Sequence, residues 1–191
     1  MRGVRVAGVT PGSAIRLDAT TDGGDSVTLR ARRVINCAGP ASGTVGALFG
    51  GTHPALFKPL RAFNVLLDVE PRLRQAVALE SRLLGGRMLF VVPGPAGLAI
   101  GTWEEPDDDA SAPSRANVER LLEAGADVLG RSDLSFDRLS AVWSGRLPRA
   151  AEGSLTPSDR PVVVDHGRAG GLHGAYSVSG VKFTTARLVA E

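Results

Sequence analysis

Short segments in which apolar and polar residues alternate run through most of this 191-residue chain, separated by turns rich in glycine and proline. A period of two is typical of β-strands that have one face in the core and the other in water. The strands indicated in this way outnumber the helices and do not alternate regularly with them. We therefore expect an α+β fold, in which the sheet that follows residue 57 is antiparallel and has flanking helices.

The first forty residues predict a small β-meander that leads into a buried strand. The segments GVRVAGVT and SAIRLDATT alternate, and TDGGD at 21–25 is a hairpin signal because its two glycines accept positive φ angles. The residues VINCA at 34–38 are nearly all apolar, which is typical of a strand covered on both faces. Ligands often bind at the carboxyl end of such a strand, here just before Gly39 and Pro40.

The remaining elements are predicted from the same kind of pattern. A short helix is possible within 41–57. Three strands are expected in LRAFNVLLDVEP and GRMLFVVPGPAGLAIGTWEEP, and further strands in LSFDRLSAVWSGRLP, RPVVVDHG and GAYSVSG. One helix begins at Ser114 and ends at Gly130, because apolar residues recur between them at helical spacing: Val118, Leu121, Leu122, Ala126 and Leu129.

Composition and charge exclude several classes of function. The net charge of +2 includes no long basic run, so nucleic acid is not an expected partner. The single cysteine, Cys37, excludes an internal disulfide, and without a Cys/His array no metal site is expected. The first residues do not form a signal peptide, and no apolar run is long enough to cross a membrane. We expect a cytoplasmic protein, with peripheral association with the inner membrane left open.

Several familiar site motifs are also missing. The sequence contains neither G-x-G-x-x-G nor G-x-x-x-x-G-K-[ST]. The three histidines are widely spaced and are expected on the surface or in loops. The acidic run from Glu104 to Asp109 lacks the spacing of a calcium loop and is expected to be a solvated turn. A Ser-His-Asp triad stays open, although no G-x-S-x-G supports one.

The closing stretch SVSGVKFTTARLVAE has the character of a binding site. Gly180 permits close approach of the backbone to a ligand, and a helix starting near Val181 would point its first N–H groups at the same place. Lys182 adds a cation, and Thr184 and Thr185 add hydroxyl donors. The same residues also alternate well enough to form an ordinary strand, so the pattern alone leaves both readings open.

Four segments in the same order resemble the FAD-dependent glycerol-3-phosphate dehydrogenases, members of the D-amino-acid-oxidase-like flavoprotein superfamily. SGVKFTTARLVAE is similar to their GGKLTTYR…AE segment, and RRVINCAGP is similar to their strand ending in NAAGP. RMLFVVPGPAGLAIGTWEEPDDD resembles FVIPW…IGTTDTPYDGD, and VWSGRLP resembles WAGLRPL. The helix expected after Ser114 also falls in the family's order, so the resemblance covers essentially all 191 residues.

The resemblance implies a division of the chain. Residues 1–57 would be the remnant of an FAD-binding domain, with the β-meander and the last strand of that incomplete domain. Residues 58–175 would form the antiparallel substrate domain, and 176–191 the return strand and the start of a flavin-facing helix. The family's N-terminal G-x-G-x-x-G segment is not in this sequence. We therefore expect a domain fragment that is inactive alone and from which FAD is absent or only weakly bound.

The resemblance also implies roles for particular residues. Lys182 and nearby backbone amides would stabilise negative charge on the reduced flavin. The residues expected to bind the cofactor are Ala38, Gly39, Pro40, Gly180, Val181, Lys182, Phe183 and Thr184. The arginine with which the family grips the substrate phosphate falls at Leu147, so Arg146 and Arg149 are the candidates to hold an anionic substrate. Trp103 stands where the family has a threonine.

Three hypotheses for function follow. The first is an FAD-dependent oxidoreductase that transfers a hydride from a small polar alcohol to flavin. The second is an amine or amino-acid oxidase of the same superfamily, and the third is a non-catalytic binding domain derived from the fold. The expected partners are a small-molecule substrate and the missing N-terminal half. Self-association through an apolar face left uncovered is a further expectation.

Overall fold

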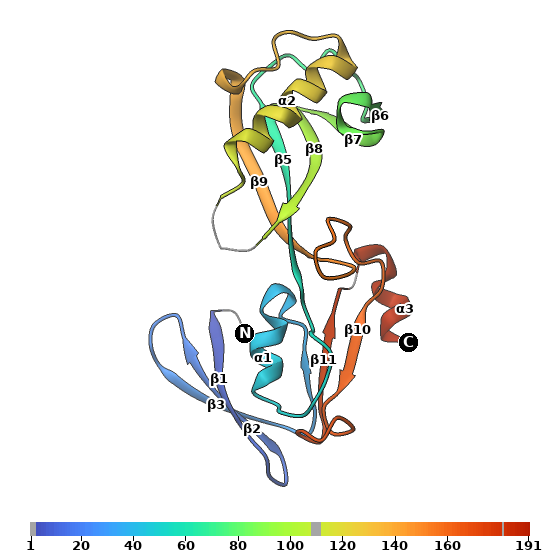
Figure 1. Cartoon of the computed structure of the whole chain (residues 1–191). Coiled ribbons are helices and arrows are strands. Elements are labelled where there is room, and N and C mark those ends of the chain that lie inside the picture. Colours follow the sequence, from blue (N-terminus) through green and yellow to red (C-terminus); the bar gives the residue numbers. More distant parts are fainter. Residues whose placement is uncertain (1–2, 108–111, 181) are drawn as a thin grey trace. The chain divides into compact units, whose positions relative to one another are not determined.

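The computed structural model describes residues 3–107, 112–180 and 182–191, and Figure 1 shows their elements. The chain divides into two compact units. Unit 1 comprises Met1–Lys58 and Pro148–Glu191, and unit 2 comprises Pro59–Leu147. Residues 148–175, which we assigned to the substrate domain, therefore lie in unit 1. The physical reason is strand pairing, because β10 (Val162–Asp165) is antiparallel to β11 (Ala175–Ser179).

The first sheet of unit 1 is the predicted meander. Strands β1 (Val4–Thr10), β2 (Ile15–Thr21) and β3 (Ser26–Ala31) pair in sequence order, each antiparallel to the next. The turn between β2 and β3 has Gly24 at a φ of 88°, a conformation that residues with a Cβ rarely adopt. The hairpin signal at 21–25 is confirmed.

The second sheet of unit 1 has the strand order β10-β11-β4, in which β4 (Val34–Asn36) lies at the edge. Strand β4 leads through the 3-10 turn η1 (Gly39–Ala41) into helix α1 (Ser42–Ala47). We expected both faces of this strand to be covered, and within this chain that expectation is wrong. Ile35 is 64% exposed, because an edge strand of three residues has no layer of this chain over its outer face. The last elements are η4 (Phe183–Thr185) and helix α3 (Ala186–Ala190).

Unit 2 is a five-stranded sheet with the strand order β6-β7-β8-β5-β9. Along β6, β7, β8 and β5 each pairing is antiparallel, as predicted. Strand β6 was not predicted, since LRQAVALES carries a weaker alternation than its neighbours. The strands are β5 (Pro59–Leu67), β6 (Val77–Ser81), β7 (Arg87–Gly94), β8 (Gly97–Pro106) and β9 (Leu139–Pro148), with the short turns η2 (Arg82–Leu84) and η3 (Phe136–Arg138).

Helix α2 (Arg115–Leu129) packs on one face of this sheet against β6 and β8 (Figure 1, yellow). It starts after Ser114 and ends at Gly130, which has a φ of 60°, so both predicted boundaries are confirmed. A Cβ on Gly125 would lie 2.9 Å from Ile100 Cδ1, so a small residue is needed where helix and sheet approach. The core contains Leu121 and Leu122 of the helix with Phe63, Val65, Leu89, Val91, Leu98 and Ile100 of the sheet.

A second set of contacts in unit 2 ties loops to one another. Arg131 is buried and makes a two-point ion pair with Asp133, with Nε to Oδ1 at 2.9 Å and Nη2 to Oδ2 at 2.7 Å. Its Nη1 donates to the carbonyl oxygens of Glu70 at 2.8 Å and Pro71 at 3.1 Å. The hydrogen bonds from Arg131 lower the pKa of Asp133 to about 2. The same pairing raises the pKa of Arg131.

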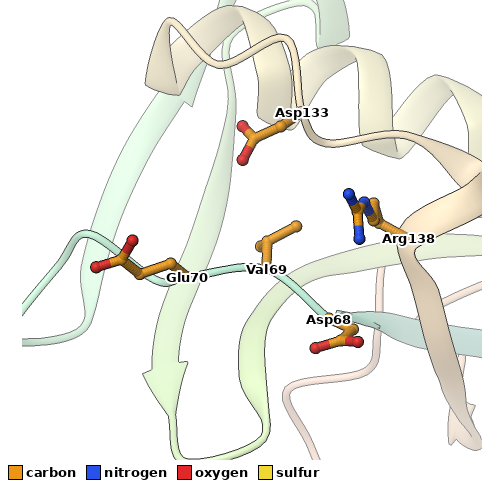
Figure 2. Close-up of a pocket in the computed structure, with 5 residues that line it drawn as sticks. All are labelled: Asp68, Val69, Glu70, Asp133 and Arg138. Atoms are coloured by element: carbon orange, nitrogen blue, oxygen red, sulfur yellow. The ribbon is translucent and has the colours of Figure 1, made fainter.

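An open hollow of about 260 Å³ lies beside this ion pair. Figure 2 shows Asp68, Glu70 and Asp133 around Val69, with Arg138 to one side. None of the residues expected to bind cofactor or substrate lines it. Acidic side chains in contact with water explain it without a ligand, so it carries no functional assignment.

No helix in the described ranges is long and apolar enough to cross a membrane.

Replacing Leu121 with alanine is expected to lower the free energy of unfolding by about 2–5 kcal/mol, because it leaves a cavity between α2 and the sheet. The matched control is Glu123→Ala, an exposed position on the same helix, which is expected to change it by less than about 0.5 kcal/mol. Urea unfolding of both variants measures the difference. Equal effects would show that α2 does not contribute to the core.

The Arg131–Asp133 pair predicts a pH dependence of stability. The pKa of Asp133 is lower in the folded chain than its ordinary value of 3.8, so the pair stabilises the fold above that pH. This contribution is lost as the pH falls through about 2. Asp133→Asn is therefore expected to be less stable than the parent near neutral pH, with the difference disappearing between about pH 4 and pH 2. Urea unfolding at several pH values measures this, and a difference independent of pH would contradict it.

Candidate functional site

The parallel pairing of β4 with β11 brings together the two segments expected to bind the cofactor. Val34 is opposite Ala175, and Asn36 is opposite Ser177. Because the strands are parallel, both carboxyl ends lie at the same edge of the sheet. The chain leaves that edge through Cys37–Pro40 after β4 and through Gly180 and Lys182 after β11. We call this edge, with the residues 37–40 and 180–184 that follow it, the cofactor edge.

The backbone at the cofactor edge is accessible. Ala38 and Pro40 are exposed, and Gly39 has a φ of 57°. A Cβ placed on Gly39 or on Gly43 would meet no atom within 4 Å, so the peptide here faces open space. A flat ring or a pyrophosphate can approach such a backbone closely.

Two hydroxyl groups near this edge are buried and have no hydrogen-bond partner within the described part of the chain, Ser42 Oγ and Ser179 Oγ. Ser42 follows the 37–41 turn, and Ser179 ends β11 directly before Gly180. Buried hydroxyls are normally satisfied, so donors without partners are consistent with a further polar group in this region. Together with the open backbone, they fit the FAD that the sequence resemblance implies.

The closing stretch differs in part from its prediction. Val181 lies outside the described residues, so the start of a helix there is not settled. Lys182 and Thr184 are exposed, and Thr185 donates to the Lys182 carbonyl from its backbone N–H at 3.0 Å and its hydroxyl at 3.2 Å. Regular helix begins only at Ala186 and has five residues. Lys182, the first described residue after Gly180, has a formal positive charge and is exposed at this edge.

Gly180 has a φ of 75°, and a Cβ there would lie 3.2 Å from the Arg160 carbonyl. Glycine is thus required by the backbone conformation as well as by the close packing. The close contacts are with this chain's own backbone, so the expected approach of the Gly180 backbone to a ligand stays a prediction.

Behind the cofactor edge lies a cluster of buried polar side chains that the sequence did not reveal. His166 lies in the turn that follows β10, which agrees with the expectation of a surface or loop histidine, but its side chain is fully buried rather than on the surface. Its Nε2 lies 2.8 Å from Ser177 Oγ, and its Nδ1 lies 3.0 Å from the Gly50 carbonyl. This is not a Ser-His-Asp triad, because Ser177 is inaccessible to a substrate and a backbone oxygen stands in the third position.

Arg146, a candidate for holding an anionic substrate, belongs to a charge cluster in unit 2. Its Nε lies 2.5 Å from Asp107 Oδ2, and its side chain is 43% exposed. Asp107 also pairs with Arg61, whose Nη1 lies 3.3 Å from Glu105 Oε1 and donates to the Ala112 carbonyl at 2.9 Å. Glu105 Oε2 accepts a hydrogen bond from Asn117 of α2 at 2.7 Å. The cluster joins β5, β8, β9 and α2.

The acidic run is therefore not simply a solvated turn. Glu105 and Asp107 are buried, which corrects that expectation, while Asp108 and Asp109 lie outside the described residues. The reason is ion pairing: among the described residues, the Glu105 and Asp107 carboxylates lie beside the guanidinium groups of Arg61 and Arg146, which offset the cost of burying them. A basic residue 44 positions away in the sequence supplies the partner, which no local pattern reveals.

Arg149, the other candidate, lies in unit 1 and is half-buried. Its backbone N–H donates to the Lys58 carbonyl at 2.8 Å, and it forms an isolated bridge with Pro157. The structure thus places the two arginine candidates in different units. Trp103 points into the unit 2 core, where it is nearly buried beside Phe63.

Asp107→Asn is expected to destabilise the fold by about 3 kcal/mol, because it leaves Arg61 buried without its full counter-charge. The matched control is Glu104→Gln, three residues earlier in β8, whose partner Arg87 is partly exposed, with an expected loss below about 1 kcal/mol. Urea unfolding measures both. Similar losses in the two variants would show that burial of the cluster has no special cost.

Comparisons with known proteins identify relatives of this chain. The chain is 25% identical over 175 residues to the mitochondrial glycerol-3-phosphate dehydrogenase of Bos taurus. This match covers 88% of this chain and 23% of that protein. Among solved structures it is similar to a glycerol-3-phosphate dehydrogenase from Bacillus halodurans complexed with FAD, with a TM-score of 0.77 and 23% identity over 98% of this chain and 36% of that one.

A glycine oxidase from Geobacillus kaustophilus also shares the fold, with a TM-score of 0.62 and 22% identity over 93% of this chain and 42% of that one. The chain thus spans less than half the length of each of these proteins. A family model described as "DAO: FAD dependent oxidoreductase" matches residues 1–191. The chain therefore belongs to the DAO family of FAD-dependent oxidoreductases.

Proposed function

We propose that this chain supplies the substrate domain and the flavin-facing edge of an FAD-dependent oxidoreductase that oxidises a small polar alcohol, as the glycerol-3-phosphate dehydrogenases do by name. FAD, when bound, supplies the hydride acceptor. We propose this activity for a longer polypeptide that contains both this chain and the rest of the cofactor domain. The chain by itself is expected to bind FAD weakly or not at all.

The observation that carries this proposal is the shared edge of β4 and β11. Two segments far apart in the sequence, 37–40 and 180–184, each expected to contact the cofactor, follow parallel strands that are direct neighbours. In sheets of this kind, ligands bind outside the carboxyl ends of the strands. The family match over the whole chain supports the same ligand.

The proposed roles follow from this placement. The exposed peptides of Ala38, Gly39 and Pro40 pass along the dinucleotide, and Gly180 allows the backbone to approach it. Lys182 contributes a full positive charge at the same edge, where negative charge on the cofactor is stabilised. Phe183 and Thr184 follow Lys182 and are assigned to the same contact region.

The substrate is proposed to be anionic and held by arginine. Arg146 is braced through its Nε by Asp107, and much of its side chain remains exposed, so the outer nitrogens of the guanidinium can face a carboxylate or phosphate. Arg149 is the other candidate.

Oxidation of an amine or amino acid is the second candidate, since Leu147 occupies the place of the family's phosphate-gripping arginine. Steady-state assays of the longest natural polypeptide containing this chain, with a dye as electron acceptor, separate the two. Turnover of polyol phosphates supports the first function, and turnover of amines alone replaces it with the second.

FAD binding tests the proposal directly. The purified chain is titrated with FAD by flavin fluorescence, alone and with a separately expressed N-terminal half. We expect tight binding only in the mixture, and about tenfold weaker binding in Lys182→Ala because a charge near the flavin is lost. Arg187→Ala, an exposed cation within α3, is the matched control and is expected to leave the affinity unchanged. Absence of binding in both conditions favours a non-catalytic domain derived from the fold.

A further inference from the structure

We propose that His166 is a positioning residue for the cofactor edge: through Ser177 and Asn36 it fixes the shape of the 37–41 turn. This inference rests on the proposed function, because the turn matters only if a cofactor lies against it. His166 itself does not belong to the cofactor edge. It follows β10, and it reaches the turn only through the two side chains between them.

All three side chains are removed from water. Asn36 is 4% exposed, and Ser177 and His166 are 0% exposed. Burial of three polar groups is unfavourable unless each hydrogen bond is made. None of these three side chains takes part directly in the proposed reaction. We therefore interpret their burial in the centre of unit 1 as structural or positioning.

The direction of each hydrogen bond can be worked out from one end. The Gly50 carbonyl can only accept, so Nδ1 of His166 carries a proton and donates across the 3.0 Å contact. In a neutral imidazole Nε2 is then the acceptor, and the Ser177 hydroxyl donates to it across 2.8 Å. The Ser177 oxygen in turn accepts from Asn36 Nδ2 at 2.9 Å. The donors and acceptors of the His166–Ser177–Asn36 chain are thus matched from one end to the other.

Asn36 connects this chain of hydrogen bonds to the 37–41 turn. Its Nδ2 also donates to the Ser42 carbonyl at 2.9 Å, and its Oδ1 accepts from the Ala38 N–H at 3.1 Å. One amide therefore holds the turn on both sides, before Gly39 and after Pro40. If the amide were reversed, its NH₂ group would face the Ala38 N–H and its oxygen would face the Ser42 carbonyl, so only one orientation satisfies all partners.

The histidine ring is held in place by its neighbours. Phe49 and His53 contact it edge to face, with ring centroids 5.0 Å and 4.9 Å away. A Cβ on Gly46 of α1 would lie 3.7 Å from His166 Cε1, and α1 lies beside β11 (Figure 1). A ring confined in this way keeps both nitrogens aimed at Gly50 and Ser177, which a positioning role requires.

The experiment uses the longest natural polypeptide that contains this chain. His166→Phe keeps an aromatic ring but loses both hydrogen bonds, whereas His166→Gln keeps one donor and one acceptor. We expect FAD to dissociate about tenfold faster from the Phe variant, and within about twofold of the parent rate from the Gln variant. His173→Gln, at an exposed histidine in the adjoining loop, is the control and is expected to leave the rate unchanged.

A double-mutant cycle separates positioning from packing. If His166 acts through Ser177, then His166→Phe has no further effect on FAD dissociation in a Ser177→Ala background. Additive effects, an unchanged rate in a folded His166→Phe variant, or equal damage from Gln and Phe would each overturn the proposal.

Hydrogen exchange at Ala38 gives a readout that does not need the cofactor. The Ala38 N–H is held by Asn36 Oδ1, so its exchange is expected to accelerate in His166→Phe and to stay slow in His166→Gln. If the parent polypeptide binds no FAD, the proposed function is wrong. The exchange measurement then still decides whether His166 shapes the turn, and unchanged exchange in the Phe variant would refute it.

Discussion

The parallel pairing of β4 with β11 is the constraint on which the candidate site depends. Asn36 and Ser177 are 141 positions apart in the sequence, yet their side chains are hydrogen bonded across this pair of strands. Parallel direction puts both carboxyl ends at one edge, and the following segments then share it. An antiparallel arrangement would place Cys37–Pro40 and Lys182 at opposite ends of the sheet. The β10-β11-β4 sheet of unit 1 therefore decides whether the two segments proposed to contact the cofactor lie together.

Different interactions stabilise the interior of each unit. Unit 2 has a broad apolar core, in which α2 packs on a five-stranded sheet, and its charged cluster is buried because its charges cancel. The centre of unit 1 contains Asn36, Ser177 and His166, whose buried side chains are joined by hydrogen bonds. Such a polar centre specifies one arrangement more strictly than apolar packing does, because any displacement leaves a buried group without a partner.

This division suits an enzyme of the proposed kind. The apolar core of unit 2 preserves the sheet, so residues outside that core can change without loss of the fold. The cofactor edge, by contrast, needs a backbone shape that does not vary. The polar groups behind it provide that shape without contacting the cofactor themselves.

Local sequence patterns determined the elements. The meander, the hairpin at 21–25 and helix α2 with its boundaries at Ser114 and Gly130 follow from periodicity and turn chemistry, which act over a few residues. The segments proposed to face the cofactor were suggested by their residue pattern and assigned to FAD by the resemblance. Tertiary structure alone decided that 148–175 joins unit 1, that Glu105 and Asp107 are buried, and that His166 is in the interior. Each of these depends on a partner distant in the sequence, and a buried charge or imidazole is stable only where that partner comes into reach.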